Sequence, residues 1–263
     1  MDARNPVATS DFPAKIGVMR TSNPTMSEST FIDVAPHGGA VMTLQGTVNK
    51  TLIFLGLLCT TAMWSWNRFW SDPSSAMPFI LGGAIAGLVL ALITAWKKQW
   101  APITGSLYAV AEGLFVGALS ALYASQYEGI VPQAILLTVG VLLALLAAYT
   151  TRLIKPSQNF KMGIAAATGG IALVYIATLV LGMFGIQVPF IHGNGLFGIG
   201  FSLFVVIIAA LNLVLDFDFI ENGVSAGAPK YLEWYAAFGL LVTLVWLYVE
   251  ILRLLAKLAG RKE

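Results

Sequence analysis

The chain has 263 residues, of which 57% are hydrophobic and only 11% are charged, and its mean hydropathy is +0.79. Charged residues make up roughly a quarter of an ordinary soluble domain, so this composition excludes the soluble globular class and indicates an integral membrane protein. The net charge of +2 comes without a basic cluster, which excludes nucleic acid as the main partner. The single cysteine, Cys59, excludes a disulfide framework and a multi-cysteine metal site.

Residues 1–46 are rich in Ser, Thr, Asn, Pro and Gly without helical or strand periodicity, which predicts a mobile soluble tail. Residues 47–263 are predicted to form one transmembrane domain, because apolar runs near the ~20 residues of a membrane-spanning helix follow one another. Seven such segments occur: Thr51–Trp70, Pro78–Trp96, Ile103–Ala124, Val131–Thr151, Lys161–Phe184, Leu196–Phe219 and Trp234–Lys257. Unbroken apolar runs disfavour a β-barrel. The predicted fold class is therefore an all-α polytopic membrane protein, a seven-transmembrane-helix bundle.

Glycines recur within these spans, among them Gly83 and Gly87, Gly113 and Gly117, and Gly163. Small residues let helix backbones approach closely in lipid, where no hydrophobic effect drives helices together. We expect these glycines at helix contacts within the bundle rather than at a dimer face.

Basic residues predict the orientation of the chain in the membrane. With the N-terminus cytoplasmic, the internal loops on the inner side carry Lys97, Lys98, Arg152, Lys155, Lys161 and Lys230. The outer loops carry only Arg68 beside Asp72. The excess of Lys and Arg in cytoplasmic loops of membrane proteins favours this orientation. Seven spans then place the basic C-terminus outside, against the same rule, and the alternative is that the last segment re-enters the membrane.

Ionisable residues within a span are functional candidates, because a charge at the bilayer centre costs on the order of 2.5–3.5 kcal/mol. Asp216 follows Asn212 by one helical turn at the end of the sixth span, whereas Asp218 lies about 200° from Asp216 around a helix. Either Asp216 faces the bundle interior and Asp218 meets the headgroup region near Glu221, or the helix unwinds here.

Two further spans carry acids. Glu112 lies near the middle of the third span, one turn after Tyr108, and is expected to be a hydrogen-bonded carboxylic acid or a proton carrier. Glu250, Arg253 and Lys257 follow at helical spacing on the last span, which favours an ion-paired polar stripe.

Several segments together resemble the Bax inhibitor/YccA family over roughly residues 45–260. They are the third-span Glu112-Gly-Leu-Phe-Val-Gly, the pair Lys97-Lys98, the Asp216 segment and the closing Leu247-Tyr-Val-Glu-Ile-Leu-Arg-Leu-Leu255. Members of a bacterial subgroup are similar to this chain also in Met19-Arg-Thr-Ser-Asn-Pro24, Gln45-Gly-Thr-Val-Asn-Lys50 and Leu215-Asp-Phe-Asp-Phe-Ile-Glu221.

The resemblance implies helices surrounding the last one and a pH-sensitive calcium leak. It also implies that an acid on the sixth helix pairs with one on the seventh, and that a basic residue after the second helix latches onto the sixth-helix acid. Asp216 matches the first acid, and Lys97 or Lys98 matches the latch. The seventh-helix acid does not match cleanly: one alignment puts Thr243 there, another Glu250. Asp218 and Glu233 are the alternative partners.

Two functions are therefore expected. The first is a pH-sensitive leak or channel for Ca²⁺ or H⁺, with ion-pathway or pH-sensing residues Asp216, Asp218, Glu112 and Asn212 and a candidate Ca²⁺ site at Asp216 and Asp218. The second is a non-conducting modulator that binds other membrane proteins, such as a membrane protease, through its tail. No catalytic residues and no cofactor are predicted, since both histidines fall outside the spans. The expected location is the bacterial inner membrane, and the sequence leaves the oligomeric state open.

Overall fold

The computed structural model describes residues 40–185, 193 and 195–261 of the chain. Among these residues, seven helices are long and apolar enough to cross a membrane. They are α2 (Leu44–Ser71), α3 (Ala76–Trp96), α4 (Ala101–Ala124), α5 (Ile130–Thr150), α6 (Gln158–Met183), α8 (Leu196–Ser225) and α9 (Leu232–Ala259). Two short 3-10 helices, η1 (Pro73–Ser75) and η2 (Lys98–Trp100), lead into α3 and α4. No strand occurs in this part of the chain, and the predicted all-α fold with seven spans is confirmed.

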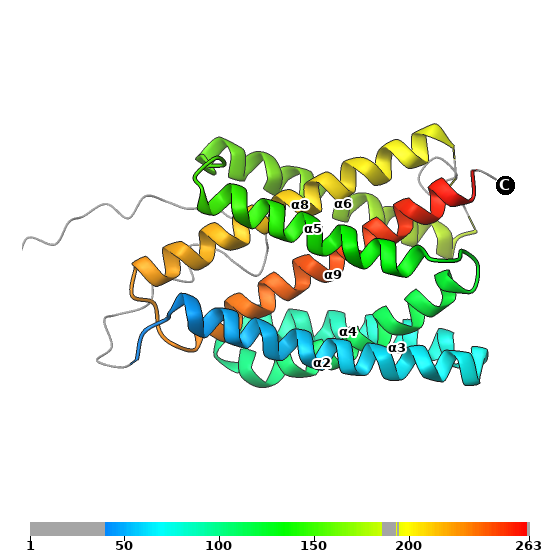
Figure 1. The fold of residues 1–263 in the computed structure, drawn as a ribbon, viewed down its shortest axis with the longest axis horizontal. Helices are drawn as coiled ribbons and strands as arrows, with labels where there is room; N and C mark the ends of the chain where they lie inside the picture. Colours follow the sequence, from blue (N-terminus) through cyan, green and yellow to red (C-terminus); the bar gives the residue numbers. More distant parts are fainter. Residues whose placement is uncertain (1–39, 186–192, 194, 262–263) are drawn as a thin grey trace, which may run out of the picture.

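Helix α9 forms the centre of the bundle (Figure 1). It contacts α2, α4, α5 and α8, and its side chains are buried from the first turn to the last. The peripheral helices differ from it sharply, because α6 buries only Lys161, Ile164 and Ile171. The start of α2, the α5–α6 connection and the α8–α9 loop lie at one end of the bundle, and the C-terminus lies at the other. We call the former the hairpin end, after the α8–α9 hairpin.

The segment before α2 is fixed by the α8–α9 loop. Met42 is 1% exposed and its backbone N–H donates to the carbonyl of Ala228 at 2.6 Å. Thr43 then caps α2 by accepting from the N–H of Gly46 at 3.0 Å. Residues 1–39 of the predicted tail lie outside the described residues. Its predicted boundary at residue 46 falls within the first turn of α2, because the polar cap extends the helix beyond its apolar segment.

Close helix contacts form where glycine removes a side chain. A Cβ atom at Gly113 would lie 2.4 Å from the carbonyl oxygen of Leu58 on α2, and one at Gly83 would lie 2.7 Å from that of Ala111 on α4. The expectation that these glycines pack within the bundle is confirmed. It is wrong for Gly163, where nothing lies within 4 Å, because α6 turns that face away from its neighbours.

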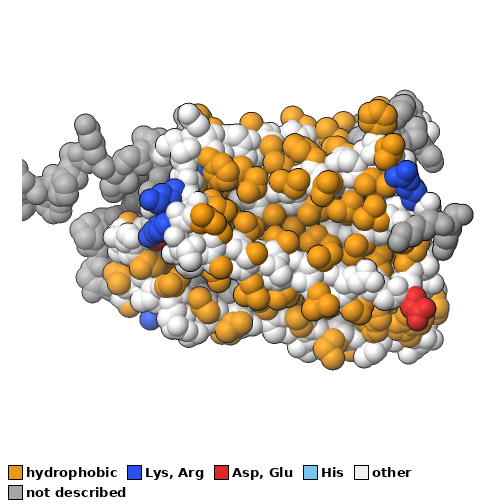
Figure 2. All heavy atoms as spheres, turned by 45° about the horizontal axis from the view of Figure 1, so that its top comes forward, with side chains coloured by type: hydrophobic (Ala, Val, Ile, Leu, Met, Phe, Trp, Pro, Cys, Tyr) orange, Lys and Arg blue, Asp and Glu red, His pale blue; other side chains and the backbone are white. Residues whose placement is uncertain are grey.

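The surface has the pattern of a membrane protein. Figure 2 shows hydrophobic side chains across the middle of the molecule and Lys, Arg, Asp and Glu side chains only towards its two ends. Large apolar residues of the helices are strongly exposed, among them Leu136 at 72% and Leu173 at 69%. Such exposure is stable only against lipid, since monomeric soluble proteins rarely expose large contiguous apolar patches.

Candidate functional site

Most acids within the described helices lie on the central α8–α9 hairpin. Only Glu112 on α4 lies elsewhere. The hairpin acids are Asp216, Asp218, Glu221, Glu233 and Glu250. Because a buried charge without a partner is costly, the contacts of these acids determine how the surrounding helices are held.

The end of α8 is tied to α5 and α6 by two ion pairs. Asp218 accepts from Lys161 on α6 at 2.5 Å and from the amide of Asn222 at 2.9 Å. Glu221 pairs with Arg152 and accepts from the hydroxyl of Tyr149. The hydrogen bond to Glu221 raises the pKa of the Arg152 guanidinium, which therefore stays charged. Both acids thus hold α8 against the helices beside it.

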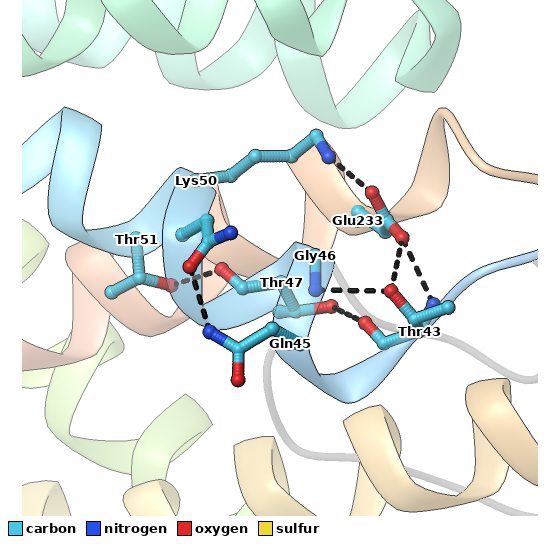
Figure 3. Close-up of polar contacts among 8 residues, drawn as sticks. Thr43, Gln45, Gly46, Thr47, Lys50, Thr51 and Glu233 are labelled. Atoms are coloured by element: carbon cyan, nitrogen blue, oxygen red, sulfur yellow. Dashed lines mark hydrogen bonds and ion pairs between the residues drawn. The ribbon is translucent and has the colours of Figure 1, made fainter.

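Glu233 connects the start of α9 to the start of α2 (Figure 3). Its side chain is fully buried and one carboxylate oxygen accepts from both the backbone N–H and the hydroxyl of Thr43 at 2.9 Å. The other oxygen pairs with Lys50, whose ammonium also lies 5.3 Å from the ring centre of Trp234. Gly46 makes this approach feasible, since a Cβ atom there would lie 2.1 Å from the carboxylate. Glu233 therefore fixes α2 to α9 in this arrangement.

Asp216 lies in the interior of the bundle. It is 0% exposed, whereas the side chain of Asp218 is 15% exposed. The helix is continuous through both residues, so of the two expected arrangements the unbroken helix is the one observed. The candidate Ca²⁺ site at Asp216 and Asp218 is not formed here, because an unbroken helix directs them to different faces and Lys161 binds Asp218.

The two lysines proposed as a latch lie in different surroundings. Lys98 is partly buried, and its ammonium lies 5.8 Å from the ring centre of Tyr235 on α9. Lys97 is exposed and lies 4.7 Å from the ring centre of Trp100 at the start of α4. Of the two, Lys98 reaches the central hairpin.

A cavity of about 240 Å³ with a mixed polar and apolar lining lies between α6, α8 and α9. Asn212 donates from its amide to Thr168 at 2.9 Å, and Thr243 lines the same cavity. Tyr175 continues the polar lining and donates to Glu250 at 2.8 Å. Thr243 thus occupies, beside Asn212, the place that one alignment assigned to the seventh-helix acid.

Beyond this cavity, α9 carries a second polar group. Arg253 donates to Glu250 at 2.8 Å and to Tyr175 at 2.9 Å. Lys257 is buried and donates to Ser202 at 2.8 Å. The expected ion-paired stripe is present, but it faces α6 and α8 rather than solvent. We use the name polar track for the side chains lining this interface: Lys257, Ser202, Arg253, Glu250, Tyr175, Thr243, Thr168 and Asn212.

Glu112 lies apart from the polar track. It is 9% exposed on α4, one turn from Tyr108, and its carboxylate contacts the backbone of α3 where Gly87 leaves room. No group of three or more His, Cys, Asp or Glu side chains suited to a metal ion occurs in the described ranges.

Sequence reasoning identified the acids but missed several of their partners. Thr43, Lys50, Tyr149 and Tyr175 were not predicted, and Lys161 was noted only as a loop charge. For Thr43, Lys50 and Lys161 the available signal was position, since they lie before or at the start of a predicted span, whereas Tyr149 and Tyr175 lie within predicted spans.

Comparison with known proteins gives a family. The model of a family described as Bax inhibitor 1 like matches residues 12–260. No curated protein and no solved structure matches the chain. The family supports a channel-type or modulator role in a membrane, in agreement with the seven apolar helices. This match covers nearly the whole chain, and the protein belongs to the Bax inhibitor 1-like family.

Proposed function

We propose that this protein is a pH-sensitive leak for Ca²⁺ or H⁺, without catalytic activity, in a bacterial inner membrane with its N-terminus in the cytoplasm. The observation that carries the proposal is the polar track between α6, α8 and α9. On α8, polar side chains run from Ser202 in the polar track to Asp218, which lies beyond the end of the track. These two residues are 16 positions apart, a rise of ~24 Å along the helix. The hydrocarbon core of a bilayer is ~30 Å thick, so polar side chains follow one interface through most of it.

Polar side chains within the hydrocarbon core of the membrane indicate a functional role. Within the membrane they are expensive and tend to face bundle interiors or ion pathways. The hydroxyl and amide oxygens of Thr168, Asn212 and Thr243 are hard ligands of the kind that bind Ca²⁺, and such oxygens accept hydrogen bonds from protonated water. The cavity they line offers an intermediate position for an ion between the two ends of the bundle.

The proposed gate is the hairpin end of the polar track. Asp216 lies one turn beyond Asn212, and the Lys161–Asp218 pair holds α6 against α8 at the same end. Lys98, which reaches α9 at Tyr235, is the proposed latch for the Asp216 region. Protonation of Asp216 removes its charge and the attraction that a lysine latch needs, so acid favours the open packing. Because α6 buries few side chains, it is the helix expected to move.

The test uses liposomes that contain only the purified protein. Ca²⁺ and H⁺ influx are followed with entrapped dyes while the external pH is varied. The proposal expects flux that rises above that of protein-free liposomes and changes with pH. Flux equal to that of empty liposomes at every pH would contradict it.

Lys98 and Lys97 provide a matched pair of variants for the latch. Lys98→Gln is expected to raise flux at neutral pH, because it removes the cation between α3 and α4 that lies against Tyr235 of the hairpin. Lys97→Gln removes an adjacent charge that lies over Trp100 and is expected to leave flux unchanged. Equal effects of the two variants would exclude a specific latch at Lys98.

A second candidate is a non-conducting modulator that binds other membrane proteins. It is favoured by the attachment of Met42 to the α8–α9 loop, which holds the start of the described chain beside the hairpin. Removal of residues 1–39 leaves Thr43 and its contacts in the chain. Loss of partner binding with unchanged flux would favour this function.

A further inference from the structure

A second cavity, of about 640 Å³, opens between α2 and α5. Its walls are formed by side chains of these two helices, and its floor is formed by α4 and α9. The lining includes Leu58, Met63, Ile135, Leu142, Val116 and Leu244. We call this cavity the lateral groove. It shares no lining residue with the cavity of the polar track.

The lateral groove is chemically suited to hydrocarbon. The hydroxyls of Ser120 and Tyr248 in its floor are 2.6 Å apart and bond to each other. Thr138 donates to the carbonyl of Ala134 in its own helix at 2.8 Å. Because these polar groups already have partners, the groove offers little to a water molecule or an ion, and apolar cavities of this kind stay dry.

The length of the groove matches one leaflet of a bilayer. On α2 it runs from Leu55 to Asn67, or ~18 Å, and on α5 from Val131 to Leu142, or ~17 Å. Half of the hydrocarbon core is ~15 Å. Towards the hairpin end, α8 contacts both α2 and α5 and passes between them, so the groove does not continue (Figure 1).

The end of the groove away from the hairpin is polar. Trp66 and Asn67 line it there, and Arg68 follows with a half-exposed side chain 3.8 Å from Asp72. Tryptophan and arginine are typical of the membrane interface, where aromatic rings and cations meet lipid headgroups. The groove is thus apolar over one leaflet and ends at polar groups of the kind that bind a phosphate.

We propose that the lateral groove binds one acyl chain of a membrane glycerophospholipid, with its headgroup beside Asn67 and Arg68. A transmembrane helix of another protein, or of a second copy, would need a groove that crosses both leaflets. The lateral groove ends at half this depth, because α8 lies between α2 and α5 there. A pocket of 300–1,000 Å³ is the usual size for a bound small molecule. The bound chain fills a space that would otherwise leave its lining without contacts.

The first test is native mass spectrometry of the full chain, released from detergent after purification from membranes. One retained phospholipid per chain is expected. Ile135→Trp fills the groove and should reduce this to none. Leu136→Trp is the matched control, because Leu136 follows on the same helix, is 72% exposed and does not line the groove. No retained phospholipid in the natural chain, or equal retention by both variants, would overturn the proposal.

A second measurement needs no variant. The natural chain is placed in bilayers that contain a phosphatidylcholine with a photoreactive diazirine near the middle of one acyl chain. Crosslinks are expected to concentrate on Cys59 and Met63 of α2 and on Ile135 and Val139 of α5. An even distribution over these and the exposed apolar faces of the other helices would overturn the proposal, as would a dimer whose α2 and α5 crosslink to each other instead.

Discussion

The ion pair between Lys50 and Glu233 predicts a measurable coupling between α2 and α9, the first and last helices of the membrane domain. Glu233 is fully buried, whereas the side chain of Lys50 is 13% exposed. Removing one partner of a buried pair costs about 3–5 kcal/mol because the other charge is left unpaired. Lys50→Met should lie at the lower end, about 3 kcal/mol, since both donors of Thr43 still reach Glu233.

Glu233→Gln is expected to be milder. Glutamine keeps an acceptor for Thr43, and Lys50 lies near a helix start where its ammonium can turn to water, so the cost is about 1–2 kcal/mol. Independent effects would sum to about 4–5 kcal/mol in the double variant. Because both changes remove the same interaction, we expect only about 2–3 kcal/mol, a coupling of about 2 kcal/mol.

The assay is unfolding by SDS in mixed micelles, followed by tryptophan fluorescence. Lys155→Met is the control, since Lys155 is exposed and the described residues give it no ion pair, and it should change stability by less than about 0.5 kcal/mol. If the effects of the two single changes add within about 0.5 kcal/mol in the double variant, Lys50 and Glu233 do not act as a pair.

Three further predictions concern packing, topology and the buried acid Glu112. Gly113→Ala should destabilise the protein by about 1–3 kcal/mol in the same assay, because its Cβ atom would lie against a backbone carbonyl of α2; Gly163→Ala, which faces open space, should not. In vesicles of known orientation, a cysteine near Gly129 should react with a membrane-impermeant reagent from outside and one near Ser157 should not, and labelling of both from one side would refute the seven-span topology. Glu112→Gln should insert and fold normally, since glutamine has nearly the same shape, and a misfolded product in gel filtration would show that the carboxylate itself is required.

The fold was accessible from the sequence because membrane spans depend on local composition. Apolar runs determined the seven helices, and the helical period determined that Asp216 and Asp218 face different directions in an unbroken helix. The start of α2 was placed too late, since Gln45 and Lys50 are polar and the helix there is stabilised by Thr43 and Glu233.

The candidate site was only partly accessible. Glu233 and Lys50 are separated by 183 residues, and no local pattern specifies that α2 and α9 start side by side. Tyr175 gave no signal either, because a tyrosine in an apolar span is common and only its neighbours on α9 make it polar lining. The acids were found because charges within a span are rare, whereas their partners depend on tertiary structure.

The proposed gate at Asp216 is tested most directly by one variant in liposomes that contain only this protein. Ion flux through the natural chain is measured across the pH range and compared with flux through Asp216→Asn, which keeps the shape of the side chain and cannot titrate. We expect the natural protein to respond to pH and Asp216→Asn to conduct with a flat response. An Asp216→Asn protein that keeps the natural pH response would contradict the gate and favour the modulator function.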